Sequence, residues 1–240
     1  MPLQRLFFCM MDGIKIAIIG DYNFTFNAHH ATNLAIDHAS VFLDIDINYY
    51  WIRVQELAQH KVGFFDQYDA FWIAPGPFVN SFYLNGIFSR LVSLKKPVLL
   101  TGEGFRFFIE YLINKHNLNL SNEKLISDNL IVGQYFENLE IIPKSEAFIK
   151  LYQHFSTREL SAVRYSLYPN LLSELLGNYL DVEAVNEFDD LEAFSLKDHP
   201  FLLALSYYPQ ITSTRDLPHP LIYTFIRAAL NQSHLINEEL

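Results

Sequence analysis

The segment of this sequence best suited to chemistry is the turn Gly102-Glu103-Gly104, which follows an apolar run at residues 97–101. The two glycines permit a tight turn from a strand into a helix, and the residue at its apex faces a helix N-terminus, which stabilises an anion. Strained turns of this type present the nucleophile in several families of hydrolases. The same residues also describe an ordinary glycine-rich turn, and the segment taken alone favours that plainer interpretation.

The residues on either side of this turn alternate between strand and helix patterns. Short apolar runs suit strands that are buried on both faces of a parallel sheet. We expect such strands at residues 14–19, 46–52, 69–74 and 97–101. The spacing of apolar residues predicts helices at residues 27–43, 81–94 and 105–114. This alternation predicts a doubly wound α/β fold, in which ligands bind at the carboxyl ends of the strands.

Short strand patterns become frequent after residue 117. We expect strands at residues 130–134, 140–142, 162–167, 181–185, 193–196 and 201–207. Further helices are expected at residues 146–155, 171–180 and 221–231. No linker, low-complexity tract or internal repeat interrupts the chain, so we expect a lead-in at residues 1–12 and a single domain at residues 13–240.

The composition limits the classes of partner. The 240 residues are 50% hydrophobic, and 17 Lys and Arg against 27 Asp and Glu give a net charge of −10. This negative charge argues against general binding to nucleic acid or to anionic membranes, which requires positive potential. The single cysteine, Cys9, excludes an internal disulfide and a cysteine-based zinc cluster, and it fits a reducing compartment. We therefore expect a cytoplasmic protein that has no membrane span, metal or cofactor.

Four segments, in order along the chain, resemble the glutaminase domain of CTP synthase, which is a class I glutamine amidotransferase. They are IKIAIIGDY (14–22), DAFWIAPGPFVN (69–80), PVLLTGEGFRFFIEY (97–111) and HPFLLALSYYPQITSTRDLPHPLIYTFIRAAL (199–230). VRYSLYPN (163–170) is similar to the Arg-Tyr segment beside the family's glutamine pocket. The chain is also similar to stand-alone CTP synthase C-terminal region-related proteins. The resemblance implies three layers around a flavodoxin-like, mostly parallel sheet that has additional mixed or antiparallel strands.

The resemblance also implies where a catalytic triad would lie. In the family a cysteine at the turn attacks the glutamine amide, a histidine transfers the proton, and a glutamate orients the histidine. This sequence has Gly102, Tyr208 and Gln210 at the matching positions. Glycine has no nucleophile, a phenol with a pKa of about 10 is a poor base at neutral pH, and glutamine carries no charge. We therefore expect that no triad residue is retained and that the protein does not hydrolyse glutamine.

The Pro-Gly loop departs from the family as well. Pro77 lies about where the family offers a backbone N–H to the oxyanion, and proline has no such donor. Loss of one oxyanion donor typically reduces the rate by ~10²–10³-fold. Four requirements for glutaminase chemistry are thus missing together, on segments that otherwise keep the family's order.

The cleft implied by the resemblance leaves several interpretations open. Its candidate ligand-binding residues are Gly76, Pro77, Phe78, Glu103, Arg106, Arg164 and Tyr208. They could bind a small polar or amino-acid-like ligand, with an arginine holding its carboxylate. Alternatively, Glu103 and Arg106, three residues apart, could pair with each other and fill the site. The protein would then serve as a scaffold for a protein partner or a homo-oligomer.

An enzyme with altered chemistry is the remaining alternative. It would use Glu103 as base or nucleophile and Tyr208 as acid, and it would need Glu103 to be exposed in an open pocket.

Other polar clusters favour structural roles. Adjacent helical residues point ~100° apart, so His29 and His30 do not easily share a metal ion, and we expect them to be solvated or partly buried. His199 and His219 precede prolines in segments that match the family's scaffold turns. The acidic run at residues 187–192 is typical of a solvated turn.

Overall fold

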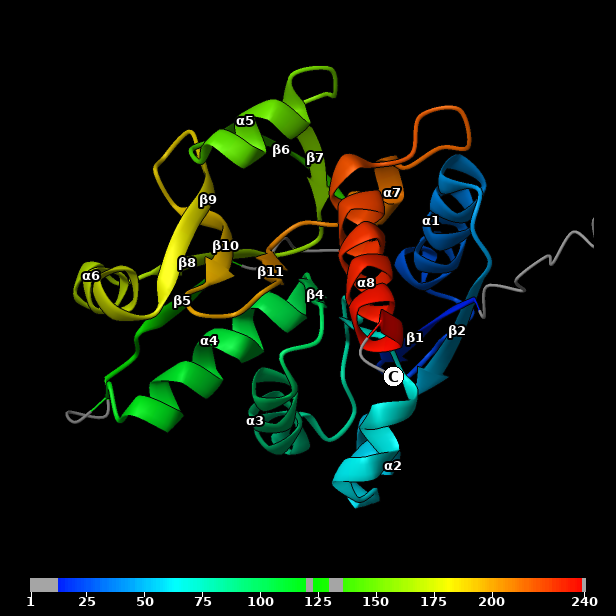
Figure 1. The fold of residues 1–240 in the computed structure, drawn as a ribbon. Helices are drawn as coiled ribbons and strands as arrows, with labels where there is room; N and C mark the ends of the chain where they lie inside the picture. The colour runs from blue at the N-terminus through cyan, green and yellow to red at the C-terminus, as the bar shows by residue number, and fades with distance from the viewer. Residues whose placement is uncertain (1–12, 120–122, 130–135, 239–240) are drawn as a thin grey trace, which may run out of the picture.

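A nine-stranded sheet forms the middle of the molecule. The computed structural model describes residues 13–119, 123–129 and 136–238 (Figure 1). The strands of this sheet are β1 (Ile14–Ile19), β2 (Ile47–Ile52), β3 (Ala70–Ile73), β4 (Val98–Thr101), β6 (Glu137–Pro143), β7 (Arg158–Ser161), β9 (Leu180–Asn186), β10 (Leu191–Leu196) and β11 (Leu202–Leu205). They lie in the order β2-β1-β3-β4-β11-β10-β9-β6-β7. Two further strands, β5 (Ile126–Asn129) and β8 (Arg164–Leu167), pair with each other as a separate antiparallel ribbon.

The strands from β2 to β11 form the parallel part of the sheet. β1 pairs with β2 and β3, while β4 pairs with β3 and β11, and all four pairings are parallel. Every residue of β3, β4 and β11 is buried, which explains why these strands are apolar apart from Thr101 at the end of β4. β10, β9, β6 and β7 extend the sheet through antiparallel pairings. The predicted α/β fold with additional antiparallel strands is confirmed.

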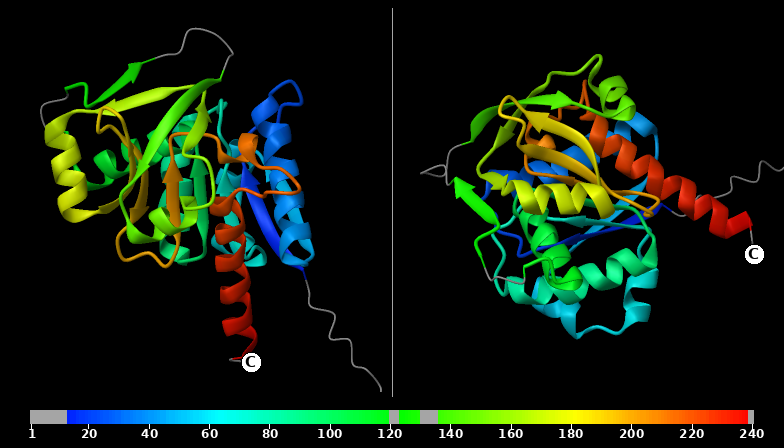
Figure 2. Two further views of the ribbon diagram at one scale, coloured as in Figure 1. Left: turned by 90° about the horizontal axis from the view of Figure 1, so that it is seen from above. Right: turned by 90° about the vertical axis from the view of Figure 1, so that its left-hand side faces the viewer.

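Helices cover both faces of the sheet and complete three layers (Figure 2). On one face lie α1 (Asn27–Leu43), α5 (Glu146–Tyr152), α7 (Pro209–Thr212) and α8 (Pro220–Glu238). On the other face lie α2 (Val54–Gln59), α3 (Leu84–Leu94), α4 (Glu103–His116) and α6 (Pro169–Asn178). Two 3-10 helices, η1 (Val62–Gln67) and η2 (Ser81–Tyr83), connect elements of the first half.

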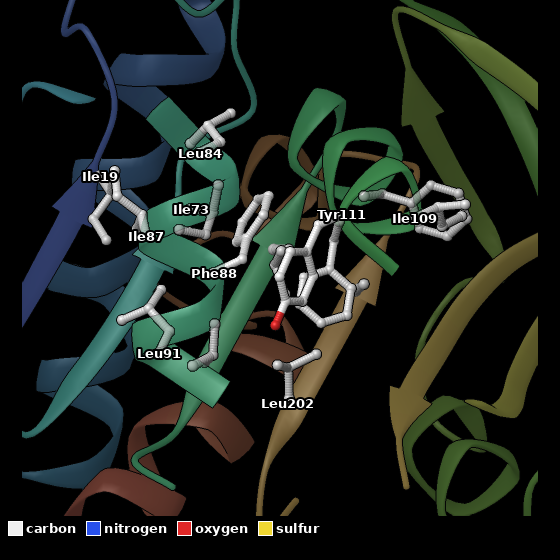
Figure 3. Close-up of a cluster of buried hydrophobic side chains, with 14 of the residues drawn as sticks. Ile19, Ile73, Leu84, Ile87, Phe88, Leu91, Ile109, Tyr111 and Leu202 are labelled. Atoms are coloured by element: carbon white, nitrogen blue, oxygen red, sulfur yellow. The ribbon is translucent and has the colours of Figure 1, made fainter. Parts of the chain in front are cut away.

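Each helical layer buries its own hydrophobic cluster against the sheet. Alternation along β1 sends Ile16 and Ile18 into the cluster under α1 and α8, and Ala17 and Ile19 into the cluster under α3 and α4. Figure 3 shows part of the second cluster, where side chains of α3 and α4 meet the strands. Its labelled members are Ile19, Ile73, Leu84, Ile87, Phe88, Leu91, Ile109, Tyr111 and Leu202. This packing fixes the strands whose carboxyl ends carry the candidate site.

Several elements differ from the sequence predictions. The expected helix at 81–94 begins as the 3-10 helix η2 and becomes α-helical only at Leu84. The expected strand at 162–167 begins at Arg164, and β7, which directly precedes it, was not predicted. α2, η1 and α7 have only six, six and four residues, too few for a helical period to stand out. The expected strand at 130–134 and lead-in at 1–12 lie outside the described residues. Within the described part of the chain, we find no helix that is long and apolar enough to cross a membrane.

Candidate functional site

Gly102 forms the turn that links β4 to α4. Its φ of 57° and ψ of −120° form a combination that residues with a side chain rarely adopt. The Gly102 N–H donates to the carbonyl of Leu205 at 2.9 Å, and the Gly102 carbonyl accepts from Phe105 at 3.1 Å. The predicted tight turn from strand to helix is therefore present, and it is tied to the neighbouring strand β11.

Tyr208 covers this turn. A Cβ atom on Gly102 would lie 2.9 Å from both the ring Cζ and the hydroxyl of Tyr208, and 2.8 Å from the carbonyl oxygen of Pro75. Tyr208 is only 5% exposed, and its backbone N–H donates to Leu160 at 2.9 Å. Burial, and secondly the nearby carboxylate of Glu103, raise the pKa of the Tyr208 phenol far above its ordinary value. The space above Gly102 is therefore filled by a neutral phenol.

Glu103 joins the start of α4 to the Pro-Gly loop. Its carboxylate packs on Gly76, so closely that a Cβ atom there would overlap it. Burial raises the pKa of the Glu103 carboxyl, whereas a hydrogen bond from the backbone N–H of Phe78 and the charge of Arg106 act in the opposite direction. The backbone N–H of Glu103 donates to the carbonyl of Pro75 at 3.0 Å. Two backbone donors of this region are thus used inside the protein.

The two predicted arginines lie in different surroundings. Arg106 donates from Nε to Glu110 at 2.9 Å, one turn further along α4, and its guanidinium lies 5.9 Å from the ring centre of Tyr165. Arg164, on β8, faces the acidic group of Glu137 at 3.5 Å. The structure therefore brings Arg106 close enough to Glu103 to lower the pKa of the Glu103 carboxyl. Arg164 instead pairs with Glu137, a residue of β6.

His29, in α1, and Asp21, in the segment after β1, form hydrogen bonds with the Pro-Gly loop. His29 Nδ1 accepts the backbone N–H of Asn23 at 2.9 Å, so its Nε2 carries the proton and donates to the Gly76 carbonyl at 2.9 Å. Asp21 accepts the backbone N–H of Val79 at 3.1 Å. His29 is 1% exposed, and burial lowers its pKa. The expectation of a solvated or partly buried His29 was wrong, because the spacing of histidines gives no sign of a loop that packs over the helix start.

The remaining loop residues lie at different depths. Pro77 is exposed and Phe78 is partly buried, with the Phe78 ring edge-on to Phe107 at a centroid distance of 5.7 Å. Gln210, in α7, is 1% exposed, and neither polar atom of its side-chain amide has a hydrogen-bond partner among the described residues.

A fully buried polar network lies behind Tyr208, and sequence reasoning missed it. Glu159 and His219 have side chains with 0% exposure and join at 2.8 Å. Because His219 Nδ1 accepts the backbone N–H of Leu221 at 3.2 Å, Nε2 is the atom that donates to Glu159. Tyr152 also donates to Glu159, at 2.9 Å, and contacts the hydroxyl of Tyr207 at 3.1 Å. The network connects α5, β7 and the start of α8 to Tyr207, the residue before Tyr208. Of its members, only His219 stands out in the sequence, as a histidine that precedes a proline.

A second buried carboxylate corrects the interpretation of the acidic run. Glu192 lies in β10 and is 3% exposed; it accepts hydrogen bonds from Asn186 at 2.7 Å and from the Ser206 hydroxyl. Burial raises the pKa of Glu192 to about 7. The strand continues through this position because its partners, Asn186 and Ser206, satisfy the carboxylate, and composition alone does not reveal such partners.

The described residues contain no group of three or more His, Cys, Asp or Glu that could hold a metal ion.

Sequence comparison relates the chain to CTP synthases. No protein-family model matches it. It is 33% identical over 102 residues to a CTP synthase of Helicobacter pylori, covering 42% of this chain and 18% of that protein. It is 25% identical over an alignment of 247 residues to a CTP synthase of Clostridium perfringens, covering 90% of this chain and 45% of that protein. The chain thus spans less than half the length of these relatives.

Structure comparison gives the same relationship at the level of the fold. The glutaminase domain of Trypanosoma brucei CTPS with bound acivicin superposes with a TM-score of 0.74 at 17% identity, covering 91% of this chain and 94% of that one. A glutamine amidotransferase of Thermotoga maritima superposes with a TM-score of 0.54 at 9% identity, covering 92% and 97%. In sequence and in fold, this chain therefore resembles the class I glutamine amidotransferases and, among them, the glutaminase domain of CTP synthase.

Proposed function

We propose that this protein is a glutaminase-like domain that has lost glutamine hydrolysis and acts by binding. The observation that carries the proposal is the position of Tyr208, whose hydroxyl and Cζ lie 2.9 Å from where the Cβ of a nucleophile at residue 102 would be. The resemblance matches Gly102 to the cysteine of the family's nucleophile elbow, and the tight turn from β4 into α4 supports that match. A glycine covered by a buried phenol offers neither a nucleophile nor room for an acyl group.

The surroundings of Gly102 support the same proposal. An oxyanion requires preorganised donors that are free to receive it. The N–H of Glu103 already donates to Pro75 at 3.0 Å, the N–H of Phe78 donates to the Glu103 carboxylate, and Pro77 has no N–H. Gln210, which the resemblance matches to the family's orienting glutamate, is neutral and buried at 1% exposure. The anion-stabilising groups of the turn are thus satisfied by the chain itself.

The alternative, an enzyme that uses Glu103 and Tyr208, rests on the raised pKa of Glu103, a shift that also suits a general acid or base. Against it, Glu103 packs on Gly76, and Tyr208 is 5% exposed with a pKa far above neutrality. A phenol that remains protonated and covered does not exchange protons with a substrate in solution. We therefore place this alternative second.

Ammonia release from glutamine tests the proposal directly. We expect the purified protein to release no ammonia above the buffer rate, under conditions in which an active class I glutaminase serves as positive control. The variants Glu103→Gln and Tyr208→Phe should leave this result unchanged. Glutamine hydrolysis at a rate comparable to the positive control would overturn the proposal. Ammonia release by the parent protein that disappears in Glu103→Gln and in Tyr208→Phe would favour the alternative enzyme.

A further inference from the structure

A cavity of about 310 Å³ lies on the helical face that carries α5 and α8, at the opposite end of the strands from Gly102. It is bounded by α5, by α8 and by the strands β9, β10 and β11, in the region where α5 and α8 approach each other (Figure 1). Leu202, at the amino end of β11, lines it, whereas Gly102 follows the carboxyl end of β4, which is parallel to β11. The cavity therefore lies at the end of the strands opposite the Gly102 turn. Its volume is in the range of small-molecule sites, ~300–1,000 Å³.

The cavity has an apolar body and one polar wall. Phe148 and Leu151 of α5, Leu203 of β11 and Leu221 of α8 contribute apolar surface. The polar wall comes from β9 and β10, where Glu183 and other polar side chains face the same helical layer. Sites that combine an apolar lining with a few fixed polar groups orient a small ligand by its polar end.

Glu183 is the fixed polar group of this wall. Ser195 donates to its Oε1 at 2.7 Å, and Ser145 donates to its Oε2. Ser145 is itself held as the N-cap of α5, since its hydroxyl oxygen accepts the Phe148 N–H at 3.2 Å. One hydroxyl thus holds each carboxylate oxygen, and each oxygen keeps capacity for a further hydrogen bond.

Among the described residues, no ion pair within 4.0 Å includes the Glu183 carboxylate. The lysine that lines the cavity, Lys197, lies 3.9 Å from Asp181 and donates to the carbonyl of Leu176 at 2.7 Å. Glu183 is partly buried, and a carboxylate that is partly withdrawn from water is stabilised by a positive neighbour. A cationic ligand would supply that positive neighbour.

We propose that this cavity binds a small organic cation, a primary amine or amidine attached to a compact apolar body. The ammonium or amidinium group donates to the Glu183 carboxylate, and the apolar body packs against Phe148, Leu151 and Leu203. This site is separate from the Gly102 turn, so the inference stands whether or not the protein hydrolyses glutamine.

Three probes of similar size test the proposal on the whole protein: benzylamine, benzyl alcohol and benzoate. Titrations followed by amide chemical shifts should show saturable changes in β9, β10 and α5 with benzylamine. A charge-assisted hydrogen bond contributes ~1.5–3 kcal/mol, so benzylamine should bind about 10–100-fold more tightly than benzyl alcohol. Benzoate should bind most weakly. No saturable change with benzylamine, or equal affinities for all three probes, would overturn the proposal.

Matched variants locate the effect. Glu183→Gln should abolish the preference for benzylamine, while Glu187→Gln, the same change at an exposed position that follows β9, should preserve it. Ala147→Trp, at an exposed position of α5 that lines the cavity, should block all three probes. If Glu183→Gln does not fold, Ser195→Ala serves instead: it removes the hydroxyl that fixes Oε1 of Glu183, so the carboxylate is no longer held in position and the preference for benzylamine should change, while the affinity for benzyl alcohol should not. The inference is refuted if the protein still prefers benzylamine after the change at Glu183 (or at Ser195) and also after Ala147→Trp, because the probe then binds elsewhere.

Discussion

At the scale of the residue, Gly102 shows how a single position excludes a side chain. The variant Gly102→Cys should lower the free energy of unfolding by ~1–3 kcal/mol, because φ is 57° and the new Cβ would meet the Pro75 carbonyl at 2.8 Å. It should also gain no glutaminase activity while Tyr208 covers the turn. Urea unfolding measures the first effect and ammonia release the second.

Gly86 provides the matched control for this prediction. It lies in α3, and a Cβ atom there would meet nothing within 4 Å. Gly86→Cys should therefore change the unfolding free energy by less than ~0.5 kcal/mol. Equal effects of the two cysteine substitutions would show that the crowding around Gly102 is unimportant.

Burial of the Glu192 carboxyl should make the free energy of unfolding decrease as the pH rises. Its folded-state pKa of about 7 lies above the ordinary 4.5, so the folded state binds more protons between these values, and stability falls as the pH rises from about 4.5 to about 7. A shift of this size corresponds to ~3 kcal/mol. Glu192→Gln should therefore be more stable than the parent at pH 8 and lose this part of the pH dependence.

Urea unfolding at pH 5 and pH 8 measures this difference for both proteins. Glu187→Gln, a change at an exposed neighbour in the sequence, should leave the parent's pH dependence intact. If Glu192→Gln destabilised the protein equally at both pH values, the carboxylate would be ionised in the folded state throughout, and the assignment of its raised pKa would be wrong.

At the scale of the element, His219 joins α8 to β7 through Glu159. Removing its ring in His219→Ala leaves a fully buried carboxylate without one of its donors, and loss of a hydrogen bond to a charged group typically costs ~1.5–3 kcal/mol. Thermal or urea unfolding measures the loss. His154→Ala, at an exposed position, should change stability by less than ~0.5 kcal/mol. A small effect of His219→Ala would mean that Glu159 is compensated by its other donors, Tyr152 and Thr212.

His29 joins α1 to the Pro-Gly loop, and its removal should loosen that loop selectively. His29→Leu loses the 2.9 Å hydrogen bond to the Gly76 carbonyl, and a net loss of ~1 kcal/mol raises local opening about fivefold. Amide hydrogen exchange at Phe78 and Val79 measures this opening. His30→Leu is the control, because His30 bonds to the Phe24 carbonyl, in the segment just before α1, and not to the Pro-Gly loop. Unchanged exchange at Phe78 and Val79 in His29→Leu would show that other contacts hold the loop.

The elements with a clear pattern were predictable from the sequence, and the contacts between distant segments were not. β1 and α1 match their predicted bounds because β1 is a mostly apolar run that stops at Gly20 and α1 keeps helical spacing of its apolar residues over 17 residues. The position of Tyr208 over Gly102 depends on β11 lying beside β4, a pairing between residues about one hundred positions apart in the chain. The resemblance matched Gly102 and Tyr208 to positions of one catalytic triad and so implied that they lie together, whereas it gave no sign of the Glu159 network or of the cavity at Glu183.

At the scale of the whole molecule, the parallel and antiparallel parts of the sheet share their cores. Phe194 of β10, in the antiparallel part, packs on Phe105 of α4 at a centroid distance of 5.1 Å, and on Phe108 of the same helix at 6.1 Å. The hydrophobic cluster under α3 and α4 continues into α6 and β9. We therefore predict that residues 13–240 unfold as one cooperative unit, which is what a single domain requires.

Two signals test this prediction. Both tryptophans, Trp51 and Trp72, lie in β2 and β3, so their fluorescence reports on the parallel part, while far-ultraviolet circular dichroism reports on all helices and strands. The two urea transitions should coincide in the parent protein. In Phe194→Ala both should move together, by an amount that corresponds to ~3–5 kcal/mol for a buried phenylalanine. If the dichroism transition alone moved to lower urea, the antiparallel part would be a separate unit, because Phe194 would then stabilise its own half without stabilising the half that carries the tryptophans.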